Sequence, residues 1–284
     1  MTPGTRIVVT GAAGQLGSTV VAHLAGDYDV VSFTRAQLDI ADEAAVIDAI
    51  GMLAPAAVIN CAAYNDVEGA EDAAMDALKG NAMGVLSLAR AARASGAILV
   101  HYSTDFVFDG ETDRPYAEVD PPRPLSTYGS SKLLGEWFAL ETPAAYVLRV
   151  ESLFGGHPAK SSIDKILAGI ENGTPVRVFS DRTVTPSYVA DVTAATAVLL
   201  KWRLPYGIYH CVNSGVTTWH GVALEAARLL QREADIVPVK SDEVKLRARR
   251  PRYCALSNQK LADAGVAMPS WQEALARYVS LSRD

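Results

Sequence analysis

The chain has 284 residues, 49% of them apolar, and its 26 Lys and Arg against 32 Asp and Glu give a net charge of −6. This composition supports a sizeable core in one or two domains and argues against nucleic-acid binding, which needs clustered basic residues. No apolar run approaches the ~18 residues of a membrane span, and no secretory leader is expected. Three widely spaced cysteines argue against a disulfide scaffold or a zinc module, so we expect a cytoplasmic enzyme.

Short β-branched runs alternate with helical patterns through the first half of the chain. Strands are predicted at 6–10, 29–33, 56–60, 97–102 and 145–150, and helices at 15–25, 42–53, 71–94 and 127–141. Continuous apolar strands separated by helices predict a parallel sheet that is covered on both faces. The expected fold class is therefore α/β, with a doubly wound parallel sheet of the Rossmann type.

Beyond residue 151 the alternation becomes less regular. Helices are predicted at 160–172, 190–202, 218–231 and 270–281, and strands at 175–179 and 207–212. We expect residues 1–151 to form a dinucleotide-binding domain, to which residues 187–214 return. Residues 152–186 and 215–284 are expected to form a smaller C-terminal α/β substrate lobe.

Gly11, Gly14 and Gly17 lie where the first strand passes into the first helix. A tight turn there needs residues without Cβ, and a pyrophosphate has to approach backbone N–H groups at the helix N-terminus. The spacing is G-x-x-G-x-x-G, and a Gly-rich turn without a ligand is the alternative. Its position between strand and helix favours a nucleotide.

The second strand ends without a carboxylate, and Arg35 follows at once. An Asp or Glu here would bind the 2′-hydroxyl of NADH, whereas an Arg suits the 2′-phosphate of NADPH. We therefore expect NADPH, with NADH possible, although a solvated surface arginine is an equal alternative. Asp39 and Ile40 could approach the adenine, or Asp39 could cap the next helix.

Tyr128 and Lys132 are four residues apart on a predicted helix, so both side chains lie on one face. A nearby ammonium stabilises an ionised Tyr, which would let it exchange protons near neutral pH. Thr104 follows the fourth strand, at the sheet edge where ligands bind in such folds. Thr104 could donate a hydrogen bond to a substrate carbonyl that Tyr128 protonates, which predicts a catalytic site.

At this point the chain resembles the dTDP-4-dehydrorhamnose reductase family of the extended short-chain dehydrogenases/reductases. The resemblance covers nearly the full length of the chain, and the motif STDFVFDG followed by YGSSKLLGE is specific. The matching phrases are GAAGQLG (11–17), NCAAYNDVEGAE (60–71), HYSTDFVFDG (101–110), YGSSKLLGE (128–136), GIYHCVNSG (207–215) and MPSWQEAL (268–275).

The resemblance implies hydride transfer from a reduced nicotinamide to C4 of a nucleotide-activated 4-keto-6-deoxy sugar, dTDP-4-dehydro-L-rhamnose above all. It implies Thr104, Tyr128 and Lys132 as the catalytic residues, and Thr104, Asp105 and Tyr128 as sugar contacts. Together with the phosphate loop and the second strand's end, it gives these expected cofactor contacts: Gly11, Gly14, Gln15, Leu16, Gly17, Arg35, Asp39, Ile40, Ala62, Ala63, Tyr64, Tyr102, Tyr128 and Lys132.

The chain departs from the family pattern after the fifth strand. Ser152 stands where similar reductases place a Trp that lines the sugar pocket, and Glu151 precedes it. We expect Ser152 to lie in a reshaped sugar subsite. Thr19 occupies a position where some relatives hold a metal through Glu, so no metal is predicted. Arginines at 182–187 and 249–252 could bind the diphosphate or could be solvated loops.

Two other functions stay open on the sequence. An epimerase or dehydratase of the same superfamily would keep NAD tightly bound, although Phe106 stands where a dehydratase tends to place a second acidic residue. A non-catalytic, reductase-like regulatory subunit is the third possibility, and the intact Thr104, Tyr128 and Lys132 argue against it. We expect a nucleotide-sugar substrate, no nucleic-acid or membrane partner, and a monomer or homodimer.

Overall fold

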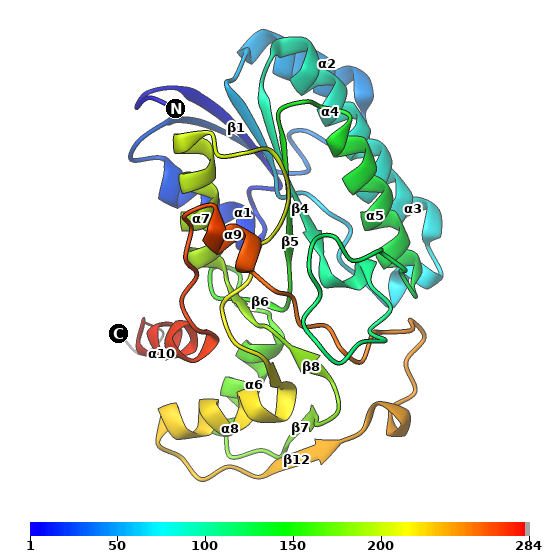
Figure 1. Cartoon of the computed structure of the whole chain (residues 1–284), viewed down its shortest axis with the longest axis vertical. Coiled ribbons are helices and arrows are strands. Elements are labelled where there is room, and N and C mark those ends of the chain that lie inside the picture. The colour runs from blue at the N-terminus through cyan, green and yellow to red at the C-terminus, as the bar shows by residue number, and fades with distance from the viewer. Residues whose placement is uncertain (282–284) are drawn as a thin grey trace.

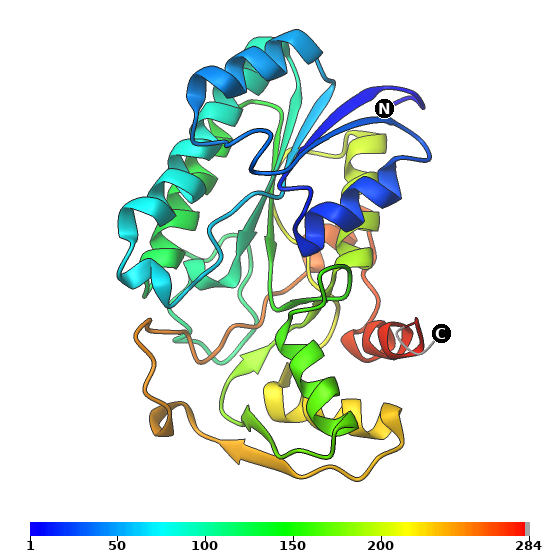
Figure 2. The same cartoon turned by 180° about the vertical axis from the view of Figure 1, so that it is seen from behind.

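A computed structural model describes residues 1–281 and contains a parallel sheet of six strands with helices on both faces (Figures 1 and 2). The strand order is β10-β5-β4-β3-β1-β2, and every neighbouring pair is parallel. The strands are β1 (Arg6–Thr10), β2 (Asp29–Phe33), β3 (Ala57–Asn60), β4 (Ile98–Thr104), β5 (Ala145–Val150) and β10 (Gly207–His210). The expected fold class is confirmed, because buried apolar strands need helices on both faces.

Helices α2 (Glu43–Leu53), α4 (Gly84–Ser95) and α5 (Thr127–Leu140) cover one face of the sheet, and α1 (Gln15–Leu24) and α7 (Val189–Trp202) cover the other (Figures 1 and 2). Helix α5 begins after Ser126, whose hydroxyl accepts a hydrogen bond from Gly129 N at 3.1 Å. This cap fixes the first turn of α5, on which Tyr128 lies. Within residues 1–281, every helix is too short or too polar to span a lipid bilayer.

A second group of elements lies beyond the carboxyl ends of the sheet strands, in the lower part of Figure 1. It contains α6 (Ser162–Glu171), α8 (Trp219–Leu230), and the parallel pair β7 (Val176–Phe179) and β12 (Ile236–Val239). The remaining elements are β6 (Leu153–Phe154), β8 (Thr183–Val184), β9 (Ser187–Tyr188), β11 (Thr217–Thr218), α9 (Gln259–Asp263) and α10 (Trp271–Leu281).

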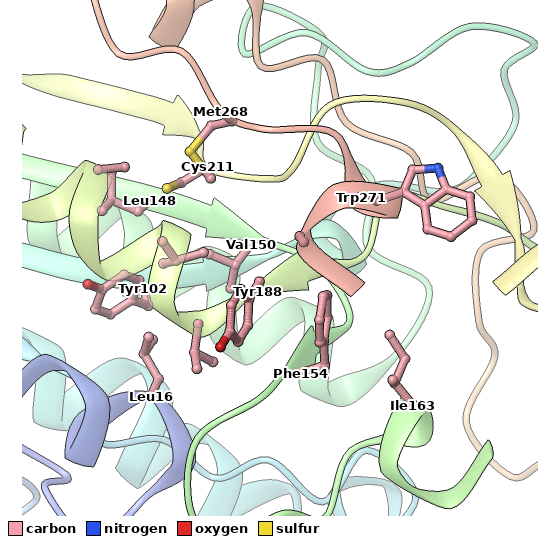
Figure 3. Packing of buried hydrophobic residues seen from close by; sticks show 14 of the residues in the cluster. Leu16, Tyr102, Leu148, Val150, Phe154, Ile163, Tyr188, Cys211, Met268 and Trp271 are labelled. Atoms are coloured by element: carbon pink, nitrogen blue, oxygen red, sulfur yellow. The ribbon is translucent and has the colours of Figure 1, made fainter. Parts of the chain in front are cut away.

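One apolar cluster joins the two groups of elements. Figure 3 shows Leu16 of α1 and Tyr102 of β4 near Phe154 and Tyr188, with Ile163 of α6 beyond them. Phe154 and Tyr188 stack with ring centroids 5.2 Å apart, and both side chains are buried. The two groups of elements therefore share a core, and the division into domains proposed from the sequence stays a prediction.

The helix predicted at 71–94 is present as an unbroken helical run over 74–95, but it is not α-helical throughout. The chain instead forms the 3-10 turn η1 (Gly69–Glu71), α3 (Ala74–Leu78), a π-helical turn (Lys79–Met83) and then α4. In the π turn the buried Asn81 accepts a hydrogen bond from Tyr64 N at 2.8 Å and donates one to Tyr64 O at 3.0 Å. The inserted turn thus anchors the loop that carries Tyr64, as π turns near functional sites commonly do.

Strand β12 and the two-residue strands were not expected. Pro238 lies inside β12 and lacks an N–H, and a proline in a sequence normally indicates the end of a strand. In a two-stranded sheet each strand has a free edge, where a missing N–H is tolerated. The strand predicted at 207–212 ends at His210. Two-residue strands carry too few residues to give a periodic signal.

Candidate active site

The phosphate loop is shaped by glycines that no other residue could replace without a shift. Gly11 has φ +70°, and a Cβ there would lie 2.5 Å from Ala62 N. A Cβ on Gly17 would lie 2.2 Å from Gly11 O. Gly14 is the N-cap of α1 and has no side chain to occupy the N–H groups of the first turn. This close-packed, uncapped helix start fits a pyrophosphate, so the loop could hold a dinucleotide.

A cavity of about 640 Å³ beside this loop is lined by Arg35 and Asp39. The Arg35 side chain is 85% exposed, and its Nε lies 3.4 Å from Asp39 Oδ2. An exposed pair of this kind is weak, so Arg35 is free to turn towards a 2′-phosphate. The alternative that Asp39 caps the next helix is wrong, because Asp42 caps α2 by accepting from Ala45 N at 3.1 Å.

The main cavity has a volume of about 960 Å³ and contains the predicted catalytic residues. Thr104 ends β4, and Tyr128 and Lys132 lie one turn apart on α5. The Thr104 hydroxyl donates to Asp105 Oδ1 at 2.9 Å and accepts from Phe106 N at 3.2 Å. The carboxyl end of β4 thus presents a polar group to the first turn of α5.

Burial raises the pKa of the Tyr128 phenol, and the nearby Asp105 raises it further. The expectation that Lys132 lowers the Tyr128 pKa is wrong for this structure. The Lys132 ammonium instead donates to Tyr102 O at 2.6 Å, and burial lowers its own pKa to about 8. Tyr128 therefore keeps its proton at neutral pH, which suits a proton donor.

A buried ion pair lies one turn further along α5. The Arg149 guanidinium donates to both carboxylate oxygens of Glu136 at 2.8 and 2.7 Å, and Ser103 Oγ donates to the same carboxylate at 2.6 Å. The two charged side chains are 2% and 1% exposed. The Glu136 carboxylate raises the pKa of Lys132 and so opposes the effect of burial. The pair therefore lies close enough to Lys132 to affect its charge.

Tyr102 was expected to contact the cofactor. Its side chain lies in the core shown in Figure 3, where its hydroxyl forms a 2.8 Å hydrogen bond with Thr196 of α7. Its backbone carbonyl holds Lys132, so Tyr102 acts on the site through its main chain.

Two carboxyl groups meet at the sheet edge beside Thr104. Asp105 and Glu151 are buried, and their oxygens and the Cys254 sulfur lie within 4.8 Å of one another. Burial raises the pKa of Asp105 to about 6, and burial together with Asp105 raises that of Glu151 well above its usual range. Ser152 follows with φ +46° and lines the same cavity.

Every residue predicted for the site lines one of the two cavities. The main cavity is lined by Gly14, Gln15, Leu16, Gly17, Ala62, Ala63, Tyr102, Thr104, Asp105, Tyr128, Lys132 and Ser152. The second is lined by Gly11, Gly14, Arg35, Asp39, Ile40, Ala62, Ala63 and Tyr64.

The sequence interpretation missed several residues of the main cavity. Trp219 is half-buried at the cavity wall, and Lys160, Lys165 and Arg177 also line the cavity. Arg182 and Arg250 line it as well, and they belong to the two segments that the sequence offered as possible diphosphate ligands. They come from separate segments, so no spacing in the sequence could have brought them together. Basic side chains around a cavity of this size suit a nucleotide diphosphate.

Comparison with known proteins places this site in a family. The family model described as "RmlD substrate binding domain" matches residues 5–283. The chain belongs to this family. It is 37% identical to a dTDP-4-dehydrorhamnose reductase of Streptomyces griseus, over 96% of this chain and 92% of that protein. The resemblance inferred from the motifs is confirmed.

Two further relatives bear on the chemistry. A dTDP-4-keto-6-deoxy-D-glucose reductase of Streptomyces niveus is 34% identical over 97% of both chains. A dTDP-4-dehydrorhamnose reductase structure from Bacillus anthracis, in complex with NADP, superposes with a TM-score of 0.94 at 32% identity. That superposition covers 98% of this chain and 99% of the other.

Proposed function

We propose that this protein is an NADPH-dependent reductase of the C4 keto group of a nucleotide-activated 6-deoxy-4-keto sugar, with dTDP-4-dehydro-L-rhamnose as its substrate. The observation that carries the proposal is the buried Tyr128 beside Thr104, in a cavity that reaches the glycine loop. Membership of the family and the NADP complex of a relative support the choice of cofactor.

When bound, NADPH supplies the hydride, and the residues of the chain bind and protonate the oxygen of the keto group. The Thr104 hydroxyl, which donates to Asp105 in the structure, would turn to donate its hydrogen bond to that oxygen and so stabilise the negative charge that develops there. Tyr128 then transfers its phenolic proton to the substrate oxygen. After reduction that oxygen is an alkoxide, which is more basic than the Tyr128 phenolate oxygen. Lys132, held at Tyr102 O one turn along α5 from Tyr128, would bind the ribose of the cofactor.

The glycine loop would hold the pyrophosphate, and Arg35 would bind the 2′-phosphate. Lys160, Lys165, Arg177 and Arg250 around the main cavity would bind the diphosphate of the sugar nucleotide. The cytoplasmic location and the monomeric or homodimeric state expected from the sequence stay predictions, as does the absence of a bound metal.

The test follows the absorbance of NADPH in the presence of enzymatically generated dTDP-4-dehydro-L-rhamnose or dTDP-4-keto-6-deoxy-D-glucose. The matched control is Tyr128→Phe, which keeps the ring packed edge-on against Phe106 at 5.7 Å. This variant should lose about 10²- to 10⁴-fold in kcat and keep its affinity for NADPH. Consumption of NADPH by Tyr128→Phe at the wild-type rate, or by the wild type with neither sugar, would contradict the proposal.

A further inference from the structure

Arg182 is a buried cation that forms no hydrogen bond within the part of the chain that the structure describes. Its side chain lies over the Phe179 ring, with Cζ 5.2 Å from the centroid, and only 6% of the residue is exposed. Its Nε is buried without a partner, and the residue lines the main cavity. Leaving a buried donor unsatisfied is costly, so Arg182 points to a ligand that accepts from it.

The sheet register places two carboxyl groups beside this cation. Thr104 of β4 pairs with Val150 of β5, so the next residue of each strand, Asp105 and Glu151, emerges at the same edge. Segment 182–184 then pairs with segment 252–254 through Thr183 N to Arg252 O and Cys254 N to Thr183 O, both 2.9 Å. This pairing places Arg182 close enough to stabilise the ionised forms of both carboxyl groups.

These three groups offer complementary hydrogen bonds. Arg182 can only donate, and Asp105 accepts when ionised. One Glu151 oxygen is used structurally, since Thr185 donates to it from N at 2.6 Å and from Oγ1 at 2.5 Å. Protonated Glu151 also has an O–H group that can donate a hydrogen bond. Burial beside Asp105 raises the pKa of Glu151 and so favours this protonated form.

A hydroxyl group both donates and accepts, so it can satisfy an acceptor and a donor of this cluster at once. A divalent cation is a poorer fit, because the Arg182 guanidinium already supplies positive charge beside the same carboxylates. The cluster is therefore built for a neutral polar group.

We propose that Glu151 and Arg182, together with Asp105, form a subsite that binds the C3 hydroxyl of the sugar and makes the enzyme selective for substrates that carry it. The proposal rests on the proposed reductase function. If Thr104 and Tyr128 hold the C4 oxygen, the neighbouring polar cluster faces a carbon adjacent to C4. In a 6-deoxy sugar, C5 carries only a methyl group outside the ring, so C3 is the neighbour with a polar substituent.

The experiment compares kcat/KM for the 4-keto-6-deoxy sugar nucleotide with kcat/KM for its 3-deoxy analogue. A buried polar site loses much of its binding free energy when its partner is missing, so the wild type should prefer the hydroxylated sugar by about tenfold or more. Arg182→Met keeps the stem over Phe179 but removes the donors, and should reduce the preference to within about threefold.

Two further variants separate a subsite from a purely structural role. Glu151→Ser should also lose the preference, and it covers the case in which Arg182→Met does not fold. Asp191→Asn is the matched control, because Asp191 is a buried carboxylate outside both cavities that binds Asn213 at 2.7 Å and Arg277. It should keep the wild-type preference even if the total rate falls.

The outcomes distinguish the two proposals. Reduction of both sugars at equal kcat/KM by the wild type would leave the reductase standing and overturn the subsite. An unchanged preference in Arg182→Met and Glu151→Ser, or turnover that EDTA abolishes and Zn²⁺ restores, would also overturn it. Turnover of neither sugar by the wild type, with NADPH still bound, would overturn the reductase and the subsite with it.

Discussion

Replacing Glu136 by Gln should destabilise the fold strongly, because it leaves the Arg149 guanidinium buried without a counter-charge. Two opposite charges about 4 Å apart attract by about 4 kcal/mol at an effective dielectric constant of 20. Both side chains are almost fully buried, so solvent cannot compensate the remaining charge. Breaking such a pair typically costs about 3 to 5 kcal/mol, and we expect a loss of this size. The same change removes the carboxylate that raises the pKa of Lys132, so that pKa should fall further below about 8.

Urea unfolding followed by the fluorescence of the four tryptophans measures this loss. The double variant Glu136→Leu/Arg149→Met removes both charges together and should unfold within about 1 kcal/mol of the wild type. Arg228→Gln, which breaks the surface pair with Glu225, is the control and should leave the midpoint unchanged. A single variant as stable as the double variant would refute the reasoning, because Arg149 would then have found another partner or water.

Three further changes test the cofactor loop and the acidic pair. Gly17→Ala should abolish NADPH binding in a fluorescence titration, because its Cβ would meet the Gly11 carbonyl oxygen. Arg35→Ala should raise KM for NADPH at least about tenfold and leave that for NADH unchanged, since only NADPH carries the 2′-phosphate. The raised Asp105 pKa means that its contribution to stability is present below about pH 4 and is lost as pH rises through about 6. Between pH 5 and 7 the wild type should therefore lose about 1 kcal/mol of unfolding free energy relative to Asp105→Asn, and equal pH dependence of the two would contradict the assigned pKa.

Local signals in the sequence predicted most of the sheet and brought the proposed catalytic residues to notice. The five predicted strands of the first half match β1 to β5 within two residues, because apolar runs of β-branched residues between helices have few other structures open to them. Tyr128 and Lys132 share a face through their spacing of four, and Thr104 meets them because strand ends in a parallel sheet share an edge. The shared face follows from local helix geometry, and the position of Thr104 follows from the general rule for parallel sheets.

What the sequence could not give depends on contacts between distant segments. The π turn is set by Asn81, whose partner Tyr64 lies 17 residues away. Arg149 and Glu136 are charged residues in otherwise apolar patterns, and only the fold shows that they neutralise each other. The closeness of Glu151 and Asp105 could be predicted in part. Strands that end at Thr104 and Val150 bring the two residues side by side once the register is known.

The proposed reaction and the proposed selectivity therefore depend on different segments of the chain. The reacting end is held by β4 and α5, where the residues are fixed by local spacing and by the ion pair behind them. The neighbouring polar cluster is formed where segments 151–152, 182–185 and 252–254 meet beside Asp105, and no local spacing rule constrains those segments. A change there, such as Ser152 and Glu151 in place of an aromatic wall, can alter the sugar that is accepted without moving Tyr128. Such a separation agrees with the occurrence, among the similar proteins, of reductases named for different 4-keto sugars.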